Sequence, residues 1–322
     1  MIQSIRWDGK PISVPGIYSD LPLPDYHRGD ICDGPSTSSS GLRKIWEPGP
    51  AHYWDTSPLN PNRNEDEDDK EAFIIGRALH HLILGQEYFA NEFVIRPDKI
   101  DGEAWQGNKK ICKAWLASMK REGKTVLTEP QIENITGMGV ALGRNPMMLN
   151  GIMNGLVERS IFWRDEETGI WLKARPDSIP TDDGQFADLK TTPSILYRKL
   201  KTAIDERCYQ MQAALVIEGA RAIGLDATGF TNLWIEKKRP YSTRVTTMQN
   251  EDLKRGHDMN RVCLRTFADC YERWTAAETP EDKLAAWPGP GDERPDAEYI
   301  ELSDAARKRI DDRLKFQLRE AA

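Results

Sequence analysis

The chain has 322 residues with a formal net charge of −7; 39% of the residues are hydrophobic and 30% are charged. This composition is typical of a globular protein with one large domain or two ordinary ones, and the chain has no run of about 18 apolar residues and no signal-peptide core, which argues against a membrane span and against secretion. The net charge argues mildly against nucleic acid as a partner, unless basic residues gather on one surface.

The five cysteines are an odd and scattered set, without a C-x-x-C pair. This pattern indicates a reducing cytosol and argues against a disulfide framework and a zinc ribbon. An iron–sulfur cluster would need four ligands close together, which the spacing does not offer. We expect all five to be small buried side chains. They are Cys32, Cys112, Cys208, Cys263 and Cys270.

The first part of the chain, residues 1–69, is rich in Pro, Gly, Ser and Asp and has little periodicity. It is predicted to be an irregular segment that wraps a core, with one short helix near residues 42–46. Apolar residues then recur at helical spacing. Helices are predicted over residues 71–84, over 107–122 and from 129 to about 143.

The period changes to two after residue 156, where short runs of bulky residues are separated by turn sequences. This pattern predicts a three-strand meander, with a tight turn at "TDDG" before its last strand. Beyond the meander the pattern returns to helices and one further strand, which indicates an α/β arrangement. The strands are expected at 157–163, 170–177, 185–192 and 229–237, and the helices at 194–219, 250–276 and 303–318.

Acidic side chains and one ammonium are expected to meet at one rim of this sheet. Side chains two apart in a strand share a face, so Asp188 and Lys190 point together while Leu189 points into the core. The turn at residues 182–184 brings Asp177 alongside, and Glu158, at the start of the first strand, could reach the same rim. The sequence therefore predicts two or three carboxylates and one ammonium in a single cluster.

Carboxylates held together repel each other unless a cation lies between them. Magnesium suits such a site, because it needs only one or two carboxylates together with waters and substrate phosphates. A bound metal polarises a phosphoryl oxygen and acidifies a coordinated water, and Lys190 could offset the charge of the transition state. The cluster thus suits phosphodiester hydrolysis. The alternative is a surface hairpin with ordinary Asp and Lys decoration, since D-x-K tripeptides are common.

Pro176-Asp177 and Asp188-Leu189-Lys190 resemble the signature of the PD-(D/E)xK nuclease superfamily. More closely, the chain resembles the exonuclease VIII (RecE-type) nuclease domains of phages and prophages, because several stretches match that family in the same order. These stretches are "YHRGDICDGPSTSSSGLRKI" at 26–45, "GRALHHLILG" at 76–85, "RPDSIP" with "FADLKTT" at 175–192, "YQMQAALV" at 209–216, and "WPGP" at 287–290, where Pro290 stands in place of the family's frequent aromatic residue.

The resemblance implies a role for each matching residue. The metal ligands would be Asp177, Asp188, the backbone carbonyl of Leu189, and His80 from the helix. The catalytic residues would be Lys190 with Asp177, Asp188 and Glu158. The DNA contacts would come from Tyr209 and Gln212. Apart from the resemblance, the basic cluster at residues 198–201 makes Lys199 a further candidate for a DNA contact.

The resemblance also implies a fold and an activity. The fold would be a PD-(D/E)xK core over residues 70–322, with a central mixed sheet flanked by helices and wrapped by extensions at both ends. The activity would be that of a magnesium- or manganese-dependent exodeoxyribonuclease, digesting linear double-stranded DNA from 5′ to 3′ and leaving 3′ single strands for recombination. A homo-oligomeric ring, a single-strand annealing protein as partner, and the cytoplasm of a bacterium carrying the phage or prophage follow from the same resemblance.

Two alternatives remain open at this point. One is a non-catalytic or weakly catalytic protein that binds DNA ends on the same fold, against which the intact Asp, Asp and Lys set counts. The other is a single-strand nuclease of the CRISPR-adaptation type, but the chain lacks the cysteine cluster that holds the iron–sulfur centre of those enzymes.

Overall fold

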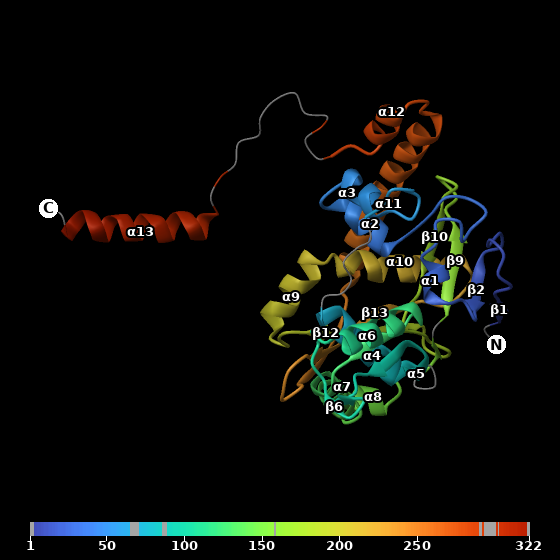
Figure 1. Ribbon diagram of the computed structural model, residues 1–322. Helices are drawn as coiled ribbons and strands as arrows, with labels where there is room; N and C mark the ends of the chain where they lie inside the picture. Colours follow the sequence, from blue (N-terminus) through green and yellow to red (C-terminus); the bar gives the residue numbers. More distant parts are fainter. Residues whose placement is uncertain are drawn as a thin grey trace.

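The protein is described here by a computed structural model in which two sheets and their covering helices form one body (Figure 1). Glu158, Pro290 and most of the acidic run at residues 64–71 lie outside the described residues. None of the helices described is long and apolar enough to cross a membrane. The described residues are 3–64, 71–85, 89–157, 159–289, 292, 301 and 303–320.

The first sheet joins strands from the N-terminal segment to the first predicted hairpin. Its strand order within the described residues is β1-β2-β9-β10-β3. β9 pairs antiparallel with both β2 and β10, and β3 runs parallel to β10. This hairpin is flanked by β2 on one side and β3 on the other, and nearly all residues of β9 and β10 are buried. The strands are β1 (Ser4–Arg6), β2 (Gly16–Ser19), β3 (Ser36–Ser38), β9 (Ser160–Arg164) and β10 (Trp171–Ala174).

The second sheet contains the last strand of the predicted meander at its centre. Its order is β14-β13-β12-β11-β8. β12 runs parallel to β13 along its whole length, whereas on its other side it pairs with β11 only through Ala187 opposite Ser178. Among the strands of the described residues, none pairs with the rest of that side of β12. The strands are β8 (Leu156–Val157), β11 (Ser178–Ile179), β12 (Gln185–Thr192), β13 (Gly229–Glu236) and β14 (Thr243–Thr247).

Helices cover the second sheet on both faces, and the pleat of β12 decides which side chains meet which helix. Ala187 and Leu189 belong to a core cluster with residues of α4 (Glu71–Leu84) and α7 (Glu129–Leu142). Phe186 points to the opposite face, where its core cluster includes residues of α10 (Tyr209–Ala222) and α11 (Asn250–Ala276). Asp188 and Lys190 share the parity of Phe186, so they face α10.

The remaining elements complete the two layers. α10 and α11 pack along each other and against α2, above β12 and β13 and beside β9 and β10 in Figure 1, while α13 stands apart from the body. Two small sheets pair β4 (Phe93–Ile95) with β7 (Thr125–Leu127) and β5 (Lys99–Ile100) with β6 (Glu103–Ala104). The helices are α1 (Leu23–Tyr26), α2 (Ser39–Trp46), α3 (Pro50–Thr56), α4 (Glu71–Leu84), α5 (Phe89–Glu92), α6 (Lys110–Arg121), α7 (Glu129–Leu142), α8 (Pro146–Leu149), α9 (Tyr197–Glu206), α10 (Tyr209–Ala222), α11 (Asn250–Ala276), α12 (Pro280–Ala285) and α13 (Asp304–Glu320).

The predicted meander and one predicted helix need correction. The predicted meander is divided between the sheets, because the chain leaves the first sheet after Ala174 and enters the second at Ser178. The predicted helix at 194–219 is two helices, α9 and α10, separated at Cys208, whose φ of 48° lies in the left-handed region. A left-handed residue ends a helix. No Gly or Pro marks this break, so the apolar spacing alone predicted one helix.

The N-terminal segment is more regular than predicted. Residues 1–69 contain β1 to β3 and α1 to α3, where the sequence led us to expect an irregular wrapping segment. These strands are three or four residues long. β2 and β3 are ordered by pairing with β9 and β10, and β1 by pairing with β2, which local sequence does not encode. The division of the chain at residues 69 and 70 stays a prediction.

We expect the close packing of α10 on α11 to depend on Gly256. A Cβ atom at this position would overlap the backbone carbonyl of Gln210, which cannot move without shifting α10. Gly256→Ala should therefore lower the free energy of unfolding by about 1–3 kcal/mol, although alanine favours helices. Gly143→Ala is the matched control, because there the nearest atom lies at 3.5 Å. Equal stability of the two variants in urea unfolding would contradict this account.

Candidate active site

Asp177 lies where the chain passes from one sheet to the other. Its Oδ2 atom accepts a hydrogen bond of 2.7 Å from the backbone N–H of Leu189 on β12. That N–H is available because β11 ends two residues after Asp177 and pairs with β12 only at Ala187. Because β11 is short, the Asp177 carboxylate can bind the backbone of β12 on the side where β11 does not pair with it.

Asp188, Lys190 and Gln212 form a closed ring of polar contacts. The ammonium of Lys190 lies 2.5 Å from Asp188 Oδ2 and donates a hydrogen bond of 2.9 Å to the amide oxygen of Gln212. The amide nitrogen of Gln212 in turn donates to Asp188 Oδ1 at 2.9 Å. The two β12 residues and the α10 residue therefore fix one another's side-chain positions.

Tyr209 completes the α10 side of the site. The Lys190 ammonium lies 4.6 Å from the centre of the Tyr209 ring, which is a cation–π contact. Tyr209 and Gln212 are three residues apart and so share one face of α10. The left-handed conformation of Cys208 starts α10 at Tyr209 and directs this face towards β12. The break that the sequence analysis missed thereby positions two of the predicted residues.

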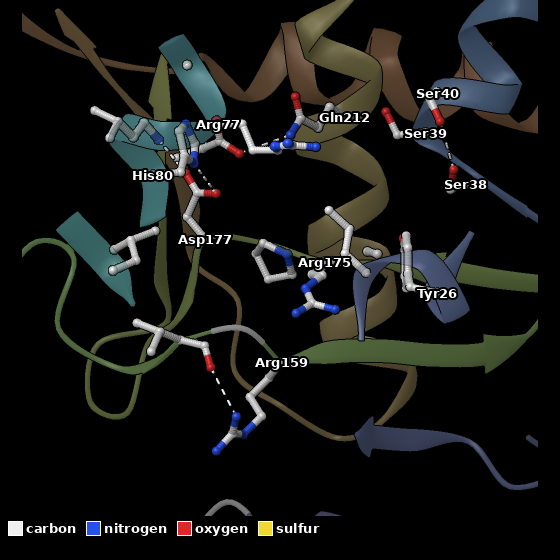
Figure 2. Close-up of a pocket in the computed structure, with 18 of the residues that line it drawn as sticks. Tyr26, Ser38, Ser39, Ser40, Arg77, His80, Arg159, Arg175, Asp177 and Gln212 are labelled. Atoms are coloured by element: carbon white, nitrogen blue, oxygen red, sulfur yellow. Dashed lines mark hydrogen bonds and ion pairs between the residues drawn. The ribbon is translucent and has the colours of Figure 1, made fainter. Parts of the chain in front are cut away.

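His80 reaches the site from α4. Its Nδ1 atom lies 3.1 Å from Asp177 Oδ1 (Figure 2), and the side chains of His80 and Asp177 are 30% and 14% exposed. Burial alone would lower the pKa of His80, but the charge and hydrogen bond of Asp177 outweigh burial, so the pKa lies above its ordinary value. Burial alone would raise the pKa of Asp177, but the charge and the hydrogen bond of His80 hold this pKa below its ordinary value. The pair therefore favours an ionised Asp177.

Asp188 is in a different electrostatic position. Its pKa is raised, first by burial and then by the charge of Asp177. Lys190 acts in the opposite direction but does not cancel these two effects. A further cation close to the two carboxylates would favour ionised Asp188.

These side chains open into a cavity of about 1130 Å³ that is rich in cations. Figure 2 shows Arg77, Arg159 and Arg175 around the cavity, with Ser38 to Ser40 on its far side. The sequence analysis missed these cations, although spacing offered a signal: Lys173 and Arg175 precede Asp177 by four and two residues, and Arg77 precedes His80 by three. The basic lining residues other than Lys190 and the histidines are Arg43, Arg77, Arg159, Lys173, Arg175, Arg207 and Lys237.

The structure brings most of the predicted site residues together. Lys199 is the exception, because it lies on an exposed face of α9 and does not line the cavity. Glu158 lies outside the described residues, and its predicted place near the carboxylates stays a prediction. The residues that line the cavity together are His80, Asp177, Asp188, Leu189, Lys190, Tyr209 and Gln212.

A family model, described as a PDDEXK-like domain of unknown function (DUF3799), matches residues 38–281, which is more than half of the chain. The chain belongs to this PDDEXK-like family. The assignment to the PD-(D/E)xK superfamily, made from Pro176-Asp177 and Asp188-Leu189-Lys190, is thereby confirmed, and so is the predicted α/β fold class.

One solved structure agrees with the fold of this PDDEXK-like domain. A candidate exonuclease from Eubacterium rectale has 13% sequence identity and a TM-score of 0.51, and the match covers 84% of this chain and 91% of that one. A phage-related exonuclease from Haemophilus somnus 129PT has 12% identity and a TM-score of 0.26, with 61% of this chain and 93% of that one covered. No curated protein sequence matches the chain.

The donor atoms of the PDDEXK-like site fit a divalent cation held mainly by carboxylates. Among the described residues, no three His, Cys, Asp or Glu side chains gather as a metal-binding group. Two carboxylates converge, however, and the buried Oδ2 atom of Asp188 lies 2.5 Å from the Lys190 ammonium. Carboxylate oxygens are ligands that suit Mg²⁺ or Mn²⁺. The predicted ligand set, which includes Leu189 and His80, stays a prediction.

Lys173, deep in the cavity wall, gives the PDDEXK-like domain a testable pH dependence. It is 4% exposed and donates a hydrogen bond of 2.7 Å to the Tyr26 carbonyl. Burial lowers the pKa of Lys173 from 10.5 to about 8. Between these two pH values the unfolded chain holds a proton that the folded chain lacks, so this group makes folding more favourable as pH rises.

The expected result is a growing stability difference between the wild type and Lys173→Met. Unfolding free energies measured in urea at pH 8 and pH 10.5 should diverge by about 3 kcal/mol in favour of the wild type at the higher pH. Other alkaline titrations cancel, because both proteins share them. A difference that stays constant with pH would show that Lys173 titrates normally in the folded state.

Proposed function

We propose that this PDDEXK-like domain is a divalent-metal-dependent exodeoxyribonuclease that hydrolyses the phosphodiester bonds of linear double-stranded DNA. The observation that carries the proposal is the ring of Asp188, Lys190 and Gln212 beside Asp177, at one wall of a cation-rich cavity. Carboxylates, an ammonium and surrounding guanidinium groups are the components that metal-assisted phosphodiester hydrolysis needs.

The carboxylates of Asp177 and Asp188 would hold the cation, magnesium or manganese. The Leu189 carbonyl is a further candidate ligand, because the N–H and C=O of one strand residue point to the same side and the Leu189 N–H points to Asp177. When bound, such an ion supplies a polarised phosphoryl oxygen and a more acidic water. His80 keeps Asp177 ionised and fixes the orientation of its carboxylate through their contact of 3.1 Å.

Lys190 would act on the reacting phosphate. Its ammonium offsets the negative charge that develops in the transition state, and a preorganised cation does so without reorganising at that moment. Gln212 and the ring of Tyr209 hold this ammonium in place. The cations that line the cavity, which include Arg77 and Arg175, would attract the phosphate backbone. The net charge of −7 is then no argument against a nucleic-acid substrate, because the positive charge is concentrated where the substrate would bind.

The finer parts of the proposal come from the resemblance to exonuclease VIII. They are 5′-to-3′ polarity, production of 3′ single strands for recombination by strand annealing, a homo-oligomeric ring, an annealing protein as partner, and action in the cytoplasm of a bacterium carrying the phage or prophage. The buried position of all five cysteines supports a reducing compartment.

End-labelled linear duplex tests the activity and its polarity together. In magnesium, label at the 5′ end should appear as nucleotide before label at the 3′ end, and EDTA should stop its release. Covalently closed circular duplex is the control and should stay intact. Linear duplex left whole in both magnesium and manganese, but bound at its ends, would replace the proposal with the DNA-end binding alternative.

A further inference from the structure

α6 has an exposed face made of cations. Its twelve residues include Lys110, Lys113, Lys120 and Arg121 but no Asp or Glu. At roughly 100° per residue, these four side chains fall within an arc of about 100°. All four are exposed, and no other residue of the described chain forms an ion pair with any of them. This differs from Lys109, just before the helix, whose ammonium pairs with Glu103 at 2.5 Å.

The opposite face of α6 anchors the helix to the body. Cys112 is fully buried, and the ring of Trp115 packs edge-on against Trp105 at 5.5 Å. Between the cations the exposed face carries only Ala114 and Ala117, which are small enough to let a flat or convex partner approach the helix. Like charges at these spacings destabilise a helix. A face that gathers four of them in a protein of net charge −7 is therefore suited to an anionic partner.

The cationic face lies close to the cavity. α6 leads through Lys124 into β7, where Thr125 accepts a hydrogen bond from the guanidinium of Arg77. Arg77 lines the cavity from α4, one turn before His80. The C-terminal end of the face, at Lys120 and Arg121, is thus connected to the rim of the active-site cavity by the turn at residues 122–124 and the contact between Thr125 and Arg77.

We propose that the cationic face of α6 binds the phosphate backbone of double-stranded DNA next to the end held in the cavity. The proposal rests on the proposed function, and it adds a duplex-binding surface outside the active site. From Lys110 to Lys120 the helix rises about 15 Å, which matches roughly four phosphates along one strand. A rigid row of evenly spaced anions that continues into the cavity complements a straight helical face better than a flexible acidic peptide does.

The test compares two variants that each lose two positive charges. Lys113→Gln with Lys120→Gln removes half of the face, and glutamine keeps the helix propensity of lysine. Lys254→Gln with Lys283→Gln is the matched control, since both residues are exposed on α11 and α12. Binding of a 30-base-pair fluorescent duplex is measured by anisotropy in EDTA over a range of salt concentrations, alongside magnesium-dependent hydrolysis of bis(p-nitrophenyl) phosphate, which is too small to reach α6.

We expect the α6 variant to bind the duplex about tenfold more weakly than the control, and the slope of log K against log salt to fall by about 2, one for each lost phosphate contact. Hydrolysis of the small ester should equal that of the wild type. Equal duplex affinity and slope in the two variants would overturn the α6 assignment, and so would a loss of affinity for anionic vesicles in place of DNA. A wild type that neither binds nor cuts duplex would instead refute the proposed function.

Discussion

Asp188→Asn is expected to abolish metal-dependent DNA cleavage while leaving the fold intact. Asparagine keeps the size of the side chain and can still meet Gln212, but it removes the charge that pairs with Lys190 and that would hold the cation. The expected loss is about 1,000-fold in the rate of nucleotide release, which corresponds to about 4 kcal/mol of transition-state stabilisation. The measurement is single-turnover cleavage of linear duplex in magnesium.

Stability should not fall with activity. The raised pKa of Asp188 means that the folded protein disfavours its ionised form, so a neutral isostere removes that cost, while Lys190 keeps its contacts with Gln212 and Tyr209. Asp258→Asn on the exposed surface of α11 is the control and should retain full activity. An Asp188→Asn variant that is unfolded, or that cleaves within tenfold of the wild type, would contradict the role given to this carboxylate.

The second large effect is expected at the ring that joins Lys190 to Gln212. Lys190→Met should slow cleavage about 100- to 1,000-fold, because the cation that offsets transition-state charge is lost. Gln212→Leu should slow it about 10- to 100-fold, since Lys190 and Asp188 then lose the amide that fixes both. The double variant should be no slower than Lys190→Met alone, because residues that act as a unit are not additive.

Gln210→Leu provides a matched control on the same helix. Its side chain points to Met259 on α11 instead of the cavity, so cleavage should stay within about twofold of the wild type. Duplex binding in EDTA should also stay within a few-fold for Lys190→Met, which separates chemistry from binding. Rate losses that simply multiply in the double variant would show that Gln212 acts on the reaction independently of Lys190.

The local geometry of the site could be predicted from the sequence because it depends on the pleat of one strand and on one turn. The period of two along β12 places Asp188 and Lys190 on one face and Leu189 in the core, as predicted. Gly184, with φ of 69°, lies in the predicted turn and allows β11 and β12 to pair. The family motifs added His80, Tyr209 and Gln212, which the fold brings to the same cavity.

What the sequence did not reveal depends on contacts between distant segments. The division of the meander into two sheets follows from pairing with β3 and β13, which come from residues more than 35 positions away. Lys199 was chosen for its place in a basic cluster, but the break at Cys208 sets α9 and α10 apart, and only α10 faces the cavity. The cations that do line the cavity come from several elements, and the signal for three of them, their spacing from Asp177 and His80, could be interpreted only once the site was known.

The central claim is that Asp177 and Asp188 together hold one divalent cation beside Lys190. Anomalous diffraction from crystals soaked in Mn²⁺ tests this claim most directly, with Asp188→Asn crystals as the reference. We predict one strong manganese peak in contact with both carboxylates in the wild type and its loss in the variant. A cavity that stays free of manganese at concentrations that support cleavage, or a peak bound elsewhere while cleavage proceeds, would contradict the account.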